Sequence, residues 1–138
     1  MITIHPFTIV EYDAVIALWQ QCEGIGLSDA DERDRIEFYL ERNPRTSFIA
    51  QDDGAVIGAI LCGHDGHRGF IHHLAVRSDY RRQGIATQLV VRGLDGLTAV
   101  GIRKCHLLIF NKNESGIAFW QHDGWELRQD INIMSKHI

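Results

Sequence analysis

The stretch that decides the fold is residues 74–86, which read LAVRSDYRRQGIA. It begins as an apolar, strand-like run, passes through a turn that contains arginine and glycine, and leads into a helix predicted over residues 87–100. A strand–turn–helix junction points free backbone N–H groups and the positive end of the helix dipole at one place. Such a place suits a phosphate or pyrophosphate group, although an ordinary helix start with solvated arginines has the same local pattern.

Three residues of this turn suit a phosphate ligand. Gly84 would let the ligand approach the backbone because it has no Cβ, and Arg81 and Arg82 would add positive charge. Other glycine motifs for phosphate are absent, since no Gly-x-x-x-x-Gly-Lys-Ser/Thr occurs and no Gly-x-Gly-x-x-Gly follows the first predicted strand. Nucleotide hydrolysis and dinucleotide redox chemistry therefore lose their usual sequence support.

Strand and helix patterns alternate along the rest of the chain. Apolar–polar alternation predicts strands, and apolar residues at helical spacing predict helices. The predicted strands are residues 2–7, 48–51, 55–62, 70–76 and 104–110, with strand-like alternation at 125–135. The predicted helices are residues 9–22, 28–43, 87–100 and 114–122. This order indicates a mixed α/β fold.

Short-range signals mark where several elements begin or turn. Thr8 with Glu11, and Ser28 with Asp31, have the spacing of a capping box, in which two residues satisfy each other's free backbone N–H groups at a helix start. The Asp53-Gly54 step favours a tight hairpin turn between two strands.

Length, composition and charge indicate one soluble domain. The chain has 138 residues, of which 45% are hydrophobic, and three cysteines without a CxxC pair, which is typical of a single domain with reduced thiols. Its 14 Lys and Arg against 18 Asp and Glu give no excess of positive charge, so we expect no nucleic-acid partner. Without a signal-peptide pattern or a run of about 18 apolar residues, we expect a cytoplasmic protein with no membrane partner.

Two motifs in the right order carry a family resemblance. Arg81-x-x-Gly84-x-Ala86, preceded by residues 74–76, resembles the acetyl-CoA-binding core of the GNAT superfamily of N-acetyltransferases. The segment from Asn113 to Trp125 is similar to the same family's Asn…Ala-x-Tyr…Gly-Phe element. The resemblance is to a small bacterial-type member with one domain over residues 1–138. It implies a mixed, mostly antiparallel sheet with a splayed strand pair and helices on both faces.

The resemblance also implies an activity and a co-substrate. It implies transfer of acetyl from acetyl-CoA to a primary amine by direct attack in a ternary complex, without a metal. An amide near Leu74 would stabilise the oxyanion, the pantetheine arm would pair with residues 74–76, and the backbone N–H groups of residues 82–87 would hold the pyrophosphate. The implied cofactor-binding residues are Leu74, Ala75, Val76, Arg81, Arg82, Gln83, Gly84, Ile85, Ala86, Thr87, Asn113 and Trp120.

Two histidines are the candidates for removing a proton from the amine. His72 is preferred because it lies beside the expected thioester position, and His73 is the alternative; a structural role for both is the remaining reading. A neutral imidazole has a pKa suited to this task. The glutamate that many family members carry on this strand falls at Phe70, so the usual carboxylate is absent.

Two further positions leave alternatives open. The tyrosine that protonates the leaving thiolate in the family falls at Trp120, whose indole can donate a hydrogen bond but cannot act as an acid. A thiolate with a pKa near 8.5 is a fair leaving group, so transfer does not require that acid. Asn113 would contact pantetheine or cap the helix that follows it. A CoA-binding regulatory module with little catalysis is therefore the alternative function.

The acceptor and the partners are less defined. The acidic link at residues 23–34 would attract a cationic amine or simply interact with its own helix dipole. The run from His64 to His67 reads as a hairpin turn rather than a metal site. We expect a small-molecule or peptide amine as acceptor, and a second copy of the chain, forming a homodimer, could cover an open sheet edge.

Overall fold

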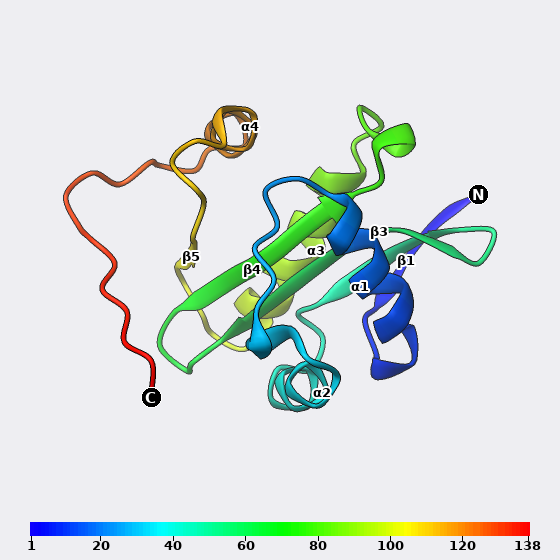
Figure 1. The fold of residues 1–138 in the computed structure, drawn as a ribbon, viewed down its shortest axis with the longest axis horizontal. Coiled ribbons are helices and arrows are strands. Elements are labelled where there is room, and N and C mark those ends of the chain that lie inside the picture. The colour runs from blue at the N-terminus through cyan, green and yellow to red at the C-terminus, as the bar shows by residue number, and fades with distance from the viewer. The chain divides into compact units, whose positions relative to one another are not determined.

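A five-stranded sheet is the central element of the computed structural model, which describes residues 1–138 (Figure 1). The chain forms two compact units, residues 1–108 and residues 109–138, and each is described by itself. The sheet belongs to the first unit. None of the helices is both long enough and apolar enough to cross a membrane.

The strands follow one another across the sheet in chain order. They are β1 (Ile2–Pro6), β2 (Phe48–Asp52), β3 (Ala55–His64), β4 (Gly69–Val76) and β5 (Cys105–Leu107). The first four strands pair antiparallel, and β5 pairs parallel to β4. Parallel pairing stops at the partners Ile71 and Leu107, so the rest of β4 has no strand on that side. The mostly antiparallel sheet with a splayed strand pair is therefore confirmed.

Helices cover both faces of the sheet. They are α1 (Tyr12–Gln21), α2 (Arg33–Arg42) and α3 (Ile85–Ala99), all in the first unit. The second unit has one helix of its own, α4 (Glu114–His122). One core combines α1 and α2 with the face of β3 that carries Ala59 and Leu61. The opposite face of β3 meets α3, where a Cβ on Gly93 would lie 3.5 Å from the side chains of Ile60 and Cys62. The mixed α/β architecture thus has α1 and α2 on one face and α3 on the other (Figure 1).

The predicted local signals are confirmed in the backbone. The N–H of Thr8 donates to Glu11, and the N–H of Ser28 donates to Asp31, at 2.9 and 3.0 Å, so both capping boxes form. Each box begins a 3₁₀ turn, Ile9–Glu11 and Asp29–Asp31, rather than the α-helix itself. Asp53 and Gly54 have φ values of +50° and +84°, the left-handed pair that a tight hairpin turn requires.

Two predicted strands differ from the structure. The strand predicted at 104–110 is only three residues long, Cys105–Leu107. No strand forms at 125–135, where the prediction was wrong. Alternation of apolar and polar side chains indicates which face of a segment could be buried. A strand also needs a neighbouring backbone to pair with its N–H and C=O groups.

Helix α3 packs closely against the chain before β2 because two of its residues are glycines, which have no Cβ atom. A Cβ on Gly93 would lie 3.3 Å from the carbonyl oxygen of Thr46, and one on Gly96 would overlap the carbonyl oxygen of Arg45. Backbone cannot move aside as a flexible side chain can. These glycines therefore set how near α3 lies to residues 45 and 46.

This contact predicts that Gly96→Ala destabilises the protein. Glycine to alanine inside a helix normally stabilises by about 1 kcal/mol, but the overlap with Arg45 should reverse the sign and cost about 1–3 kcal/mol. Urea unfolding of the variant measures the change. The matched control is Asp95→Ala, at the exposed neighbouring position of the same helix, which should change the free energy of unfolding by less than about 0.5 kcal/mol. An equal or greater stability of Gly96→Ala would contradict the packing argument.

Candidate active site

The turn before α3 leaves the helix N-terminus open. Gly84 precedes the helix with a φ of +78°, and its carbonyl accepts the N–H of Gln88 at 3.0 Å. The N–H groups of residues 85–87 have no partner within the helix, and no side chain caps them. Residues 81–84 are exposed, and Arg82 is left-handed with a φ of +63°. The sequence-predicted residues of the phosphate turn thus come together at one exposed helix start.

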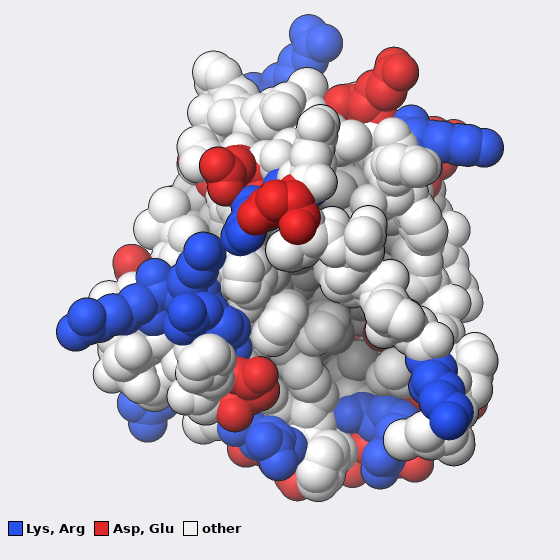
Figure 2. Space-filling view, turned by 90° about the vertical axis from the view of Figure 1, so that its left-hand side faces the viewer, with Lys and Arg blue, Asp and Glu red and all other residues white.

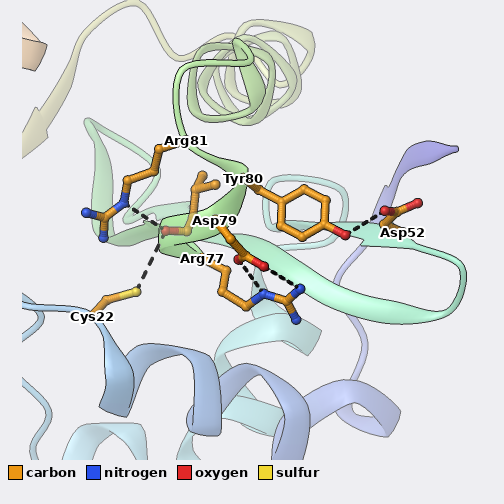
Figure 3. A network of polar contacts seen from close by, with 7 residues as sticks. Cys22, Asp52, Arg77, Asp79, Tyr80 and Arg81 are labelled. Atoms are coloured by element: carbon orange, nitrogen blue, oxygen red, sulfur yellow. Dashed lines mark hydrogen bonds and ion pairs between the residues drawn. The ribbon is translucent and has the colours of Figure 1, made fainter.

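Arg81 has an additional structural contact. Its Nε donates to the carbonyl oxygen of Val76 at 3.3 Å, and the Cys22 thiol points at the same oxygen at 4.0 Å (Figure 3). The end of β4 is therefore tied to the turn and to the end of α1. Part of the guanidinium predicted for phosphate is thus used inside the protein.

A second set of contacts holds the 3₁₀ turn Ser78–Tyr80. Arg77 forms two hydrogen bonds with Asp79, at 2.7 and 3.1 Å, and the Tyr80 hydroxyl donates to Asp52 at 2.6 Å (Figure 3). The Tyr80 hydrogen bond and the amino group of Met1 hold the pKa of Asp52 below its usual range. Asp52 lies at the end of β2, so the hairpin β2–β3 supports the phosphate turn, which no local sequence signal indicates.

The open side of β4 lies directly before this turn. Leu74, Ala75 and Val76 pair with β3, while β5 has already diverged after Ile71. Backbone N–H and C=O groups on that side can pair with an extended ligand, as a further strand would. The structure therefore places the predicted pantetheine segment next to the predicted pyrophosphate turn.

A β-bulge lies in β4 where the two candidate histidines occur. Leu61 of β3 faces His73, and the next residue, Cys62, faces Ile71, so His72 is an extra residue without a partner position. A bulge of this kind interrupts the alternation of side chains, and bulges are frequent beside active sites. Both histidines therefore lie on the face covered by α1 and α2, whereas strict alternation would separate them.

His72 lies against aromatic rings at the edge of this face. Its ring centroid is 5.4 Å from that of Tyr39, edge-on, and 6.2 Å from that of Phe70, stacked. The residue as a whole is exposed to solvent. Desolvation beside these rings lowers the pKa of His72, the neighbouring His73 lowers it further, and Asp31 opposes the change. This lowered pKa favours the neutral form of the His72 imidazole.

His73 is held by a carboxylate. Its Nε2 lies 2.8 Å from Oδ1 of Asp31, and its ring centroid is 4.7 Å from that of Trp19. Burial alone would raise the pKa of Asp31, but the hydrogen bond and charge of His73 and the N–H of Ser28 outweigh it and hold that pKa below its usual range. Asp31 belongs to the acidic link predicted to shape the acceptor site, but the sequence did not show this contact.

Two buried polar atoms lie near the histidines without a hydrogen-bond partner, the indole N–H of Trp19 and the hydroxyl of Tyr39. Burial raises the pKa of Tyr39, so it stays a neutral phenol. A Cβ at Gly63 would overlap this hydroxyl, and glycine there leaves room for the ring. Tyr39 thus packs edge-on against His72 as a neutral phenol.

The turn after β3 is organised by its own side chains. Asp65 accepts the N–H groups of His67 and Arg68, at 2.7 and 2.8 Å, and His64 accepts the N–H of Gly66. This is the hairpin predicted from the sequence. No group of three or more His, Cys, Asp or Glu side chains could hold a metal ion.

The remaining two predicted residues belong to the second unit. Asn113 caps α4, since its side chain accepts the N–H of Gly116 at 3.0 Å. Trp120 packs edge-on against Phe119 and Trp125, with ring centroids 5.1 and 5.0 Å away. The capping role of Asn113 is confirmed, and its contact with a cofactor stays a prediction, as does that of Trp120.

Comparison with known proteins identifies the family. The model of the acetyltransferase (GNAT) family matches residues 12–125. The chain belongs to this family. An acetyltransferase of Pectobacterium atrosepticum is 34% identical over 135 residues, which are 98% of this chain and 95% of that protein. The GNAT resemblance drawn from the two motifs is confirmed, and the chain is an acetyltransferase by family.

Solved structures show the GNAT fold. The PaiA N-acetyltransferase from Thermoplasma acidophilum, in complex with coenzyme A, has a TM-score of 0.81 at 16% identity and covers 95% of this chain and 93% of its own. AAC(6′)-Iy, in complex with the bisubstrate analogue CoA-S-monomethyl-acetylneamine, has a TM-score of 0.79 at 22% identity. The match covers 100% of this chain and 99% of the AAC(6′)-Iy chain.

Charge is mixed on the surface of this acetyltransferase. On the face drawn in Figure 2, Lys and Arg side chains form several separate groups with Asp and Glu side chains among them. This distribution agrees with the formal net charge of −4. Side chains of neither charge sign cover that whole face.

We expect His72 to titrate below the ordinary histidine pKa of about 6.5. Asp31→Asn should lower the pKa of His72 further, because a negative charge that favours the imidazolium is removed. His73→Gln should raise the pKa, because a neighbour that opposes the second positive charge is gone. An NMR titration of the histidine rings measures the midpoint, and His72→Gln identifies the signal. A wild-type midpoint at or above 6.5 would contradict the assigned environment.

Proposed function

We propose that this acetyltransferase transfers the acetyl group of acetyl-CoA to a primary amine by direct attack within a ternary complex. The observation that carries the proposal is the open side of β4 at residues 74–76, next to the uncapped N-terminus of α3. An extended amide chain followed by a pyrophosphate matches that pair of features. The structural relatives in complex with coenzyme A or a CoA-linked bisubstrate analogue support acetyl-CoA as the co-substrate.

In the proposed complex the backbone supplies most of the cofactor contacts. The N–H groups of residues 82–87 bind the pyrophosphate, the pantetheine arm pairs with residues 74–76, and an amide near Leu74 donates to the thioester oxygen. The donor stabilises negative charge that develops on this oxygen in the tetrahedral intermediate. The family match spans both compact units, which supports one functional domain over residues 1–138.

The proton of the amine is removed by a histidine of the β4 bulge. A primary amine is protonated at pH 7 and cannot attack until it loses a proton. His72 and His73 lie together on one face, and the sequence favours His72. The lowered pKa of His72 favours the neutral imidazole form, which either histidine must have to accept a proton.

We propose a small molecule or a peptide as the source of the amine. The bisubstrate analogue bound to AAC(6′)-Iy, CoA-S-monomethyl-acetylneamine, supports a small molecule as the acceptor. In this chain the link between α1 and α2 supplies Asp31 beside the bulge. The acceptor would thus approach from the face covered by α1 and α2.

The proposed activity predicts release of free CoA thiol in the presence of an amine. We expect turnover with at least one member of a panel that contains a polyamine, an amino acid, an aminoglycoside and peptides with a free N-terminus or lysine. Mass spectrometry of the product locates the new amide. Binding of CoA without turnover of any amine would contradict the proposal and support a regulatory CoA-binding module.

Replacement of Gly84 by leucine should abolish thermal stabilisation by CoA. The side chain would cover the N–H groups at the start of α3, and binding at 100 times Kd otherwise adds about 2.7 kcal/mol. Gly101→Leu is the matched control, because Gly101 also has a left-handed φ, +85°, and open space around it, at the other end of the helix. A full CoA shift in Gly84→Leu, or loss of the shift in both variants, would contradict the pyrophosphate assignment.

A further inference from the structure

The surroundings of the two bulge histidines indicate which of them receives the proton, given the proposed function. We propose that Asp31 is a positioning residue that makes His73 the proton acceptor for the incoming amine. The observation behind this inference is the 2.8 Å contact between Nε2 of His73 and Oδ1 of Asp31. The two residues are 42 positions apart in the chain, with His73 on β4 and Asp31 in the 3₁₀ turn before α2.

The carboxylate of Asp31 is held at both oxygens. While Oδ1 contacts His73, Oδ2 accepts the N–H of Ser28 at 3.0 Å. The carbonyl oxygen of Asp31 accepts the hydroxyl of Tyr12 at 2.6 Å, which ties the 3₁₀ turn to α1. The side chains of His73 and Asp31 are 10% and 8% exposed. A carboxylate fixed in this way can hold an imidazole in one orientation.

The contact also determines which nitrogen of His73 is free. With the proton on Nε2 donated to Asp31, the lone pair of a neutral imidazole lies on Nδ1. This nitrogen has no hydrogen-bond partner in the protein and is not among the fully buried unpartnered atoms. Trp19 packs against the ring and limits its rotation. A base oriented by a third group is the arrangement that activates amines and other nucleophiles.

His72 lacks this support. Its contacts are the rings of Tyr39 and Phe70, and neither of its nitrogens forms a hydrogen bond. Nothing therefore selects the tautomer or the orientation of His72. We assign it to the wall of the acceptor site, beside the proton acceptor.

One histidine is sufficient for the proton transfers of the reaction. The ammonium group of the acceptor gives a proton to Nδ1 of His73, and the nitrogen lone pair forms a bond to the thioester carbon. The carbon–sulfur bond then breaks, and its electron pair leaves on the sulfur. A second proton from the amine passes to this thiolate. The products are the amide, free CoA and one proton that His73 releases to solvent.

The experiment compares kcat and KM of the wild type with those of Asp31→Asn and His73→Gln. Asparagine offers one acceptor oxygen, so it cannot serve both His73 and the N–H of Ser28. We expect kcat to fall by about 10- to 100-fold in Asp31→Asn and by at least about 100-fold in His73→Gln, within the range of general-base catalysis. The double variant should lose no more than His73→Gln, because the two residues act as one unit. KM for acetyl-CoA should stay within about twofold.

Two measurements separate positioning from simple loss of structure. The ¹⁵N spectrum of the His73 ring should show the proton on Nε2 in the wild type and a mixture of tautomers in Asp31→Asn. Thermal stabilisation by CoA should persist in both single variants. Glu37→Gln, which removes an exposed carboxylate of α2, is the control for a general charge effect and should keep kcat.

Each outcome is decisive. Undiminished kcat in Asp31→Asn or His73→Gln, or a wild-type proton on Nδ1, overturns this inference while the proposed function stands. A loss of activity in His72→Gln that exceeds the loss in His73→Gln also overturns it, in favour of His72 as the proton acceptor. Absence of turnover by the wild type overturns the proposed function and the inference together.

Discussion

Beyond Ile71, β4 has a neighbouring strand on one side only, although Arg81 donates to the carbonyl oxygen of Val76 at its end. In an ordinary sheet the next strand would satisfy the polar groups of residues 72–76, but β5 ends its pairing after three residues. The other features of the site are arranged around this open segment. The bulge lies at its start, the phosphate turn follows its end, and the α1–α2 face brings Asp31 beside it. An extended ligand with its own amides can take the place of the missing strand.

The parts of the fold and site that were predictable are those with local causes. The capping boxes, the Asp53-Gly54 turn and the start of α3 each depend on residues within a few positions of one another. The family motif around Gly84 belongs to the same class. The contacts of Asp31 with His73 and of Asp52 with Tyr80 join residues 42 and 28 positions apart. No pattern in either segment indicates its partner, because strand register and helix placement determine both contacts.

The strand predicted at residues 125–135 was wrong because a local pattern does not show which segment lies beside it. Residues 125–135 alternate as a strand does, yet no strand forms there. Alternation is a property of one segment, whereas a β-strand requires hydrogen bonds from another. At the bulge, alternation fails for a different reason. There β3 has one residue fewer than β4, so His72 and His73 follow one another without alternating between the two faces. The ordering of the candidate bases from sequence relied on position along β4 and could not include the contacts that each ring makes.

The bulge also constrains how this family member can change during evolution. Substitution at His72 alters one side chain, but deletion of one residue between Phe70 and His73 would remove the extra position. Ile71 would still face Cys62 and His73 would still face Leu61, but the bulge would be gone and only one of the two histidine positions would remain on the face covered by α1 and α2. The hairpin around Gly66, which is exposed and held by its own residues, carries no such restriction. Length differences among close relatives should therefore accumulate in that hairpin and be excluded from β4.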